Sequence, residues 1–172
     1  LQNIGKGITK YFPNECSISV VWGKIYRKKF IIENELNFKE NIKKMPDAIF
    51  NIWAFEKAQK ISHYNIYGYH YRKNTNSITQ NFYEKCRKDV EIFLGEVAKY
   101  IKIYNKDEDY IKTYNIATLT SISDMLSNYY VNPNNKKQHA IIKQEFTEFI
   151  NNEQHKKALK EIDVENVEIA ES

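Results

Sequence analysis

The stretch SITQNFYEKCRKDVEIFLGEVAKYIKIYN, residues 77–105, carries the strongest structural signal in the chain. Its apolar side chains recur every three or four residues almost throughout, which is the spacing of one helix face. Ser77 can cap the first turn, and Gln80 completes a capping box three residues later. We therefore expect an amphipathic helix of roughly 40 Å, around which the rest of the chain packs. Its apolar positions are Ile78, Phe82, Cys86, Val90, Phe93, Val97, Tyr100, Ile101 and Tyr104.

Further segments on both sides of this stretch have helical spacing. Residues 46–61 begin with Pro46 and Asp47, which both favour a first helical turn. Residues 33–44 show a weaker helical pattern. After a polar turn at 105–109, residues 111–129 form another pattern, which the Asn-Pro-Asn-Asn run at 132–135 ends. Residues 135–160 predict a last helix, in which the pattern fades after Ile150, so that we expect that end to be exposed.

These segments predict a mainly α fold. Short connections between successive helices favour antiparallel neighbours, as in a bundle of three to four helices around residues 77–105. A small β or extended element is expected at 17–32, where residues alternate and strand-forming side chains are common. We expect one domain over residues 1–172, with an irregular lead-in at 1–14. Residues 161–172 form an acidic tail that is either a short strand or a frayed end.

The composition is that of a globular protein. Of the 172 residues 42% are hydrophobic and 28% are charged, which is too apolar for a disordered chain. No apolar run approaches the roughly 20 residues that a membrane helix needs, and the first ten residues show no signal core. The two cysteines, Cys16 and Cys86, form neither a disulfide framework nor a zinc quartet. We expect a cytoplasmic protein without membrane contact, in a reducing compartment.

Charge is distributed unevenly along the chain. Residues 1–90 contain 16 basic and 8 acidic residues, a net charge of +8, and residues 91–172 contain 10 and 14, a net charge of −4, which together give the overall +4. A basic first half is typical of a protein that meets an acidic partner. The alternative is that the two halves neutralise each other within the fold.

Two segments of the basic half mix cations with aromatic rings, the combination that binds single-stranded nucleic acid. If the first segment, residues 22–30, has only a structural role, it is a half-buried strand with a solvated lysine face. The second, at 62–73, would then pack its rings over the long helix with their polar tips in water. The candidate nucleic-acid-binding residues are Lys24, Tyr26, Arg27, Lys28, Lys29, Tyr69, Tyr71, Arg72 and Lys73.

Metal and catalytic signals are weak. His63 and His70 lack a third ligand at useful spacing. Asp107, Glu108 and Asp109 precede a predicted helix, where capping and the helix dipole favour acids without any ion. No phosphate-binding loop, nucleophile signature or zinc-protease motif is present. We therefore expect no cofactor and no metal, and an enzyme is less probable than a binding protein.

The sequence thus predicts a non-enzymatic binding or accessory protein whose basic half engages an acidic partner. Nucleic acid or a nucleoprotein assembly is the expected partner. The alternative is a protein-binding module or inhibitor, which docks a partner through an exposed hydrophobic groove or helix face. Such a module would expose an apolar patch of more than a few hundred Å². The oligomeric state is left open by the sequence.

Overall fold

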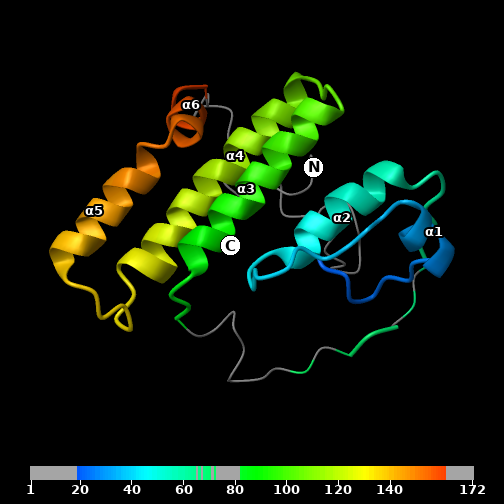
Figure 1. Ribbon diagram of the computed structural model, residues 1–172, viewed down its shortest axis with the longest axis horizontal. Coiled ribbons are helices and arrows are strands. Elements are labelled where there is room, and N and C mark those ends of the chain that lie inside the picture. Colours follow the sequence, from blue (N-terminus) through cyan, green and yellow to red (C-terminus); the bar gives the residue numbers. More distant parts are fainter. Residues whose placement is uncertain (1–18, 65, 67, 71, 73–81, 162–172) are drawn as a thin grey trace.

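The computed structural model describes residues 19–64, 66, 68–70, 72 and 82–161, and this part of the chain is mainly helical (Figure 1). It contains no strand, so the predicted β element is wrong for residues 19–32, and the mainly α class is confirmed. The prediction of one domain stays a prediction. The elements are α1 (Lys28–Glu33), α2 (Pro46–Lys57), α3 (Cys86–Ile103), α4 (Glu108–Met125), the π-helix η2 (Leu126–Tyr130), α5 (His139–Ile150) and α6 (Glu153–Glu161).

Helix α3 is shorter than predicted. The expected capping box at Ser77 lies outside the described residues, and residues 82–85 are not helical, so the helix starts at Cys86. Phe82 therefore does not continue the apolar face of α3. Its ring instead stacks on Tyr129, with ring centroids 5.5 Å apart. The apolar spacing included Phe82 because its side chain is also partly buried, although it packs on a different surface.

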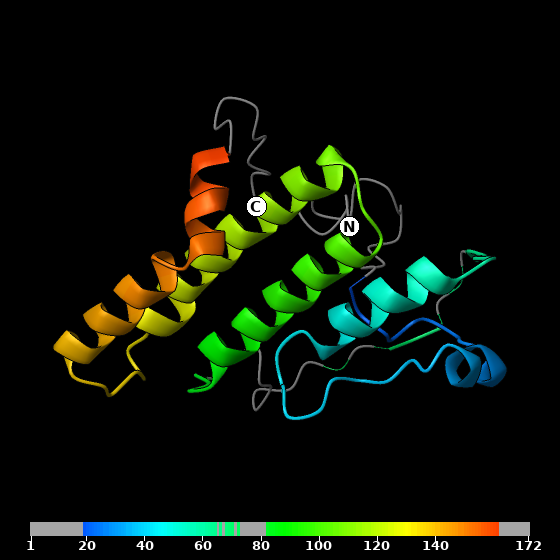
Figure 2. The same ribbon diagram turned by 45° about the horizontal axis from the view of Figure 1, so that its top comes forward.

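Helices α3 and α4 lie side by side and run in opposite directions (Figures 1 and 2). Between them, Asn105 takes a left-handed conformation with φ of 44°, which Asn tolerates better than most residues. The Asp107 carboxylate accepts a hydrogen bond from the Tyr110 backbone N–H at 3.2 Å and caps α4. This acidic run therefore has the capping role that its position predicted. Helix α2 packs on α3, and α6 packs on α4.

The main core lies along α3, which has α2 on one side and α4 on the other (Figures 1 and 2), and it continues to η2 and α5. The π-helical turn lets the adjacent Tyr129 and Tyr130 both be buried, because it changes the rotation between successive side chains. The largest side chains that are almost completely buried are Phe149, Leu94, Met125 and Val97.

The last predicted helix is two helices in the structure. Helix α5 ends at Ile150, and α6 begins at Glu153 after the two asparagines that had diluted the pattern. The Asn152 side chain accepts a hydrogen bond from the Gln154 backbone N–H at 2.9 Å, as helix-starting asparagines do. His155 is buried, so the predicted exposure of residues 151–157, where the pattern fades, is wrong at that position.

The region before α2 is held by buried polar groups. Residues 28–33 form helix α1 instead of a strand, and residues 34–45 form a loop where a weak helix was predicted. Asp89 of α3, only 1% exposed, accepts hydrogen bonds from the backbone N–H groups of Lys43 (2.7 Å) and Lys44 (2.9 Å). Asn51 of α2 donates to the Val20 carbonyl at 3.0 Å. Helix α2 itself was predicted correctly, although it ends at Lys57.

Candidate binding face

The exposed side chains of residues 25–32 form the surface that we call the α1 face. Its basic members Arg27, Lys28 and Lys29 are all exposed, and Arg27 is the residue from which α1 starts. Lys29 forms a loose ion pair with Glu33 at 3.6 Å, in which both side chains are mostly in water. Such a pair contributes little to stability, so the Lys29 ammonium is available to another anion.

Two isoleucines lie among these cations. Ile25 is fully exposed, and Ile32 is 63% exposed. Beside them, Ile31, Ile32, Glu35, Leu36 and Asn37 line a shallow depression at the end of α1. Phe30 and Ile31 are partly buried against a small core formed by Leu36, Phe50 and Ala54. The α1 face is therefore both basic and apolar.

Two of the candidate residues are engaged inside the chain. The Tyr26 hydroxyl donates a hydrogen bond to the Asn51 side-chain oxygen at 2.5 Å, and its ring meets Phe50 edge-on. Burial, with a smaller contribution from the charge of Asp47, raises the pKa of Tyr26 to about 12. The Lys24 ammonium donates to the Val20 carbonyl. Both residues thereby fix the chain that leads into α1.

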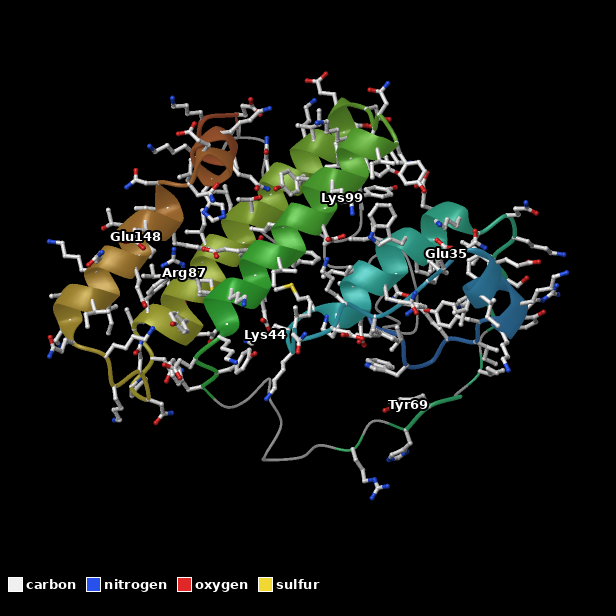
Figure 3. All side chains as sticks on the ribbon, viewed as in Figure 1. Glu35, Lys44, Tyr69, Arg87, Lys99 and Glu148 are labelled. Atoms are coloured by element: carbon white, nitrogen blue, oxygen red, sulfur yellow. The ribbon has the colours of Figure 1, made fainter. Side chains whose placement is uncertain are left out.

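The tyrosine-rich connection lies against the same region. Tyr69 stacks on Trp22, with ring centroids 5.3 Å apart and planes inclined by 21°, which brings this segment next to the chain that leads into α1. Figure 3 labels Tyr69 on this connection, away from α3 and α4. Arg72 is exposed. The candidates Tyr71 and Lys73 lie outside the described residues.

Exposed apolar side chains are concentrated in two segments, residues 25–38 and 61–69. Of the twelve large hydrophobic side chains that are exposed in the described part of the chain, seven belong to residues 25–38 and 61–69. In Figures 1 and 2 the chain after α2 passes beside α1, so these two segments are neighbours in space. The seven are Ile25, Ile32, Phe38, Ile61, Tyr64, Ile66 and Tyr69.

Ion pairs join the two halves of the chain at other residues. Lys39 pairs with Glu96 at 2.8 Å, and Lys106 pairs with Glu56 at 2.7 Å. Arg87 binds Glu91 at 2.9 Å and Glu148 at 3.5 Å. Lys39 and Arg87 of the basic half are thus neutralised by acids of the second half, as the alternative interpretation expected, whereas the pair of Lys106 and Glu56 joins a cation of the second half to an acid of the first. Among the described residues these pairs do not use the cations of the α1 face.

Sequence reasoning missed a second cluster, at the turn between α3 and α4. There the rings of Tyr100, Tyr104 and Tyr110 surround the ammonium of Lys106, which also binds Glu56. The signal was present in the spacing, because Tyr100 and Tyr104 are one helical turn apart and Tyr110 follows the turn that carries Lys106. Both tyrosines of α3 had been assigned only to its apolar face.

Comparison of the chain with protein-family models, with curated proteins and with solved structures finds no match. Within the described ranges, no helix is long and apolar enough to cross a membrane. The same residues contain no group of three or more His, Cys, Asp or Glu side chains that could hold a metal ion.

Proposed function

We propose that this chain is a non-enzymatic binding protein whose α1 face docks an acidic protein segment that also carries apolar side chains. The observation that carries the proposal is the mixture of exposed side chains over residues 25–32, in which Ile25 and Ile32 flank Arg27, Lys28 and Lys29 in the sequence. Carboxylates of the partner would neutralise the cations. Its aliphatic or aromatic side chains would cover the isoleucines and enter the depression beside α1.

The isoleucines favour a protein partner over nucleic acid. An aliphatic side chain neither pairs with phosphate nor provides the flat ring on which a base stacks. Exposed isoleucine costs free energy in water, and a protein partner would recover it at about 25 cal/mol for each Å² that is covered. The ring of Tyr26, one of the three tyrosines expected to stack bases, is committed to the interior.

Binding of labelled probes to the purified chain tests this proposal. The probes are a short peptide of alternating acidic and aliphatic residues, a polyglutamate peptide of equal length and a single-stranded uridine oligonucleotide. We expect the first peptide to bind at least about tenfold more tightly than polyglutamate, because roughly 1.4 kcal/mol of apolar burial corresponds to that factor. Fluorescence anisotropy measures all three affinities.

Two sets of variants separate the apolar and the basic contributions. The double variant Ile25→Ser with Ile32→Ser should lower the affinity for the acidic–aliphatic peptide only. The triple variant Arg27→Gln with Lys28→Gln and Lys29→Gln should lower the affinity for both peptides. The matched control replaces Lys112, Lys143 and Lys156, which are exposed on α4, α5 and α6, by Gln and should leave affinity unchanged. Equal binding of the two peptides, or equal loss in the control variant, would overturn the proposal.

Nucleic acid is the second candidate partner. The observation that favours it is the exposure of Tyr64 (74%) and of Tyr69, whose ring extends the stack that begins on Trp22. In this case the uridine oligonucleotide binds more tightly than either peptide, Tyr69→Ala weakens it, and affinity falls steeply with salt. The isoleucine variant would then bind the oligonucleotide as well as the unmodified chain does.

A further inference from the structure

The turn between α3 and α4 contains an aromatic cage around a cation. The Lys106 ammonium lies 5.2 Å from the ring centroid of Tyr100, 5.5 Å from that of Tyr104 and 5.0 Å from that of Tyr110. All three distances fall within the roughly 6 Å over which an aromatic face attracts a cation. The three rings come from the end of α3 and the start of α4, so the helix hairpin itself positions them.

A carboxylate closes the cage. The two Glu56 oxygens accept hydrogen bonds from Lys106 at 2.9 Å and 2.7 Å, and one of them also accepts from the Tyr100 hydroxyl. Burial tends to raise the pKa of Glu56, but the hydrogen bonds from Lys106 and Tyr100 outweigh it and hold the pKa below its usual value. Glu56 is therefore anionic at neutral pH, which is the charge that an ammonium ligand requires.

Trp53 forms an outer wall of the cage and fixes two of the tyrosines. Its ring meets Tyr100 edge-on at 5.9 Å and lies 6.1 Å from Tyr104, and Lys99 lies over its other side at 5.9 Å. Lys99 is labelled in Figure 3 on α3, beside α2. Because Trp53 and Glu56 both belong to α2, the packing of α2 on α3 sets the geometry of the cage.

Aromatic faces attract methylated ammonium groups as well as primary ones. The Lys106 nitrogen lies 5.0–5.5 Å from the three ring centroids, so methyl groups on an ammonium held at this position would point towards the ring faces. Glu56, in contrast, touches the nitrogen at hydrogen-bond distance, so that a ligand must keep at least one N–H directed at it.

We propose that Glu56, Tyr100, Tyr104 and Tyr110 form a binding site for a partially methylated lysine-type ammonium group of a partner, and that Lys106 occupies this site until such a ligand displaces it. Lys106 is suited to leave because it belongs to the connecting turn, next to the left-handed Asn105, and not to a helix. Its side chain is 17% exposed, so the site opens to solvent at its edge. The proposal does not depend on the α1 face.

Titration with a short neutral peptide that contains one dimethyl-lysine tests the proposal. We expect the tyrosine ring resonances of the unmodified chain to shift at high peptide concentration. In Lys106→Ala the same shifts should reach their midpoint at a concentration at least tenfold lower, because the internal competitor is gone. Lys112→Ala is the matched control, since Lys112 is an exposed lysine of α4 outside the cage, and its midpoint should equal that of the unmodified chain.

Further arms identify the contacts. Adding Tyr104→Ala to Lys106→Ala should raise the midpoint at least tenfold, and the trimethyl-lysine peptide should bind Lys106→Ala more weakly than the dimethyl form because it offers no N–H to Glu56. Lys106→Met, which keeps the aliphatic stem, replaces Lys106→Ala if the latter does not fold. A folded Lys106 variant that shows no shifts at about 10 mM peptide, or equal binding of the two methylated peptides, would overturn the assignment.

Discussion

The part formed by α3 to α6 and the part that precedes α2 are stabilised in different ways. From α3 onwards, long helices bury contiguous apolar faces in one large core. Between residue 19 and α2 the structure describes one short helix, α1, which packs on a small core whose buried members are Leu36 and, from α2, Phe50 and Ala54. Ile42 of the following loop is buried in the large core. Individual polar side chains of α2 and α3 hold that region in place. Apolar burial therefore dominates from α3 onwards, and specific hydrogen bonds dominate in the region before α2.

This difference decides which region is available for function. Five large hydrophobic side chains are exposed over the whole of residues 86–161, whereas the much shorter stretch 25–38 exposes Ile25, Ile32 and Phe38. Regions with a small core and backbone bonds near solvent also open at lower free energy than the rest of a protein. We therefore expect binding at the α1 face to order its surroundings, and the large helical core to act as the support.

Substituting one buried leucine in each core tests this difference with the largest expected effect. Leu94 lies in the large core at 1% exposure, and Leu36 lies in the small one at 6%. We expect Leu94→Ala to lower the free energy of unfolding by about 4 kcal/mol, and Leu36→Ala by about 2 kcal/mol, because the smaller core can collapse around the lost side chain. Urea denaturation measures both.

Leu159→Ala is the control for these variants, since Leu159 is half-exposed on α6. It should change the free energy of unfolding by less than about 0.5 kcal/mol. If Leu36→Ala costs as much as Leu94→Ala, the two parts share one cooperative core and the contrast drawn above is wrong.

The helical part and the region before α2 also differ in how well the sequence predicts their structure. Periodicity predicted α2, α3 and α4 because their stability derives from an apolar face that recurs along the chain. It failed before α2, where Glu35, Asn41 and Met45 adopt left-handed conformations, with φ of 52°, 63° and 61°. Such positions follow no periodic pattern. The loop that contains Asn41 and Met45 is also held by Asp89, which bonds the N–H groups of Lys43 and Lys44 from more than forty residues away in sequence.

The candidate site shows the same limits. Composition indicated the cations of the α1 face, and they are exposed as a binding surface requires. It could not distinguish Tyr26, whose ring and hydroxyl are committed to the interior, from Tyr69, whose ring is half-exposed. That distinction depends on Asn51, which only the packing of α2 brings to Tyr26. Local spacing indicates the tyrosines around Lys106, but it could not reveal that Glu56 and Trp53 of α2 complete the cage.

Removing the Asp89 carboxylate tests whether one polar side chain holds the loop before α2. We expect Asp89→Ala to lower the free energy of unfolding by about 3 kcal/mol, because it leaves the N–H groups of Lys43 and Lys44 without their acceptor. Hydrogen exchange of these two amides should also accelerate more than that of α4. Calorimetry and exchange measured by NMR give both quantities.

Asp124→Ala is the matched control, because Asp124 is an exposed aspartate of α4, and it should change stability by less than about 0.5 kcal/mol. Asp89→Asn keeps an acceptor oxygen and should cost less than Asp89→Ala. Equal exchange rates for the loop amides in Asp89→Ala and in the unmodified chain would show that the loop has another anchor.

The hydrogen bond between Tyr26 and Asn51 offers a smaller test of the same region. Asn51 is 1% exposed, and it binds both the Tyr26 hydroxyl and the Val20 carbonyl. We expect Asn51→Ala to cost about 2 kcal/mol and Tyr26→Phe about 1 kcal/mol. In the double variant the loss of the hydroxyl should cost almost nothing further, since its acceptor is already absent. Additive losses, measured by denaturant unfolding, would contradict the assigned bond.

The smallest expected effect concerns Glu56, which links α2 to the turn after α3 through Lys106. The pKa of Glu56 is lower in the folded chain than the usual value of about 4.3. A depressed carboxyl pKa contributes stability that is present above the unfolded pKa and is lost as the pH falls through the folded pKa. We expect Glu56→Gln to reduce the free energy of unfolding at pH 7 by about 0.5–1 kcal/mol and to make its decline below about pH 4 less steep.

Glu108→Gln, which disrupts the exposed pair with Lys112, should leave that decline unchanged. An equally steep decline in Glu56→Gln would mean that other carboxyl groups control the acid limb, and that the ion pair to Lys106 does not couple α2 to the helix hairpin.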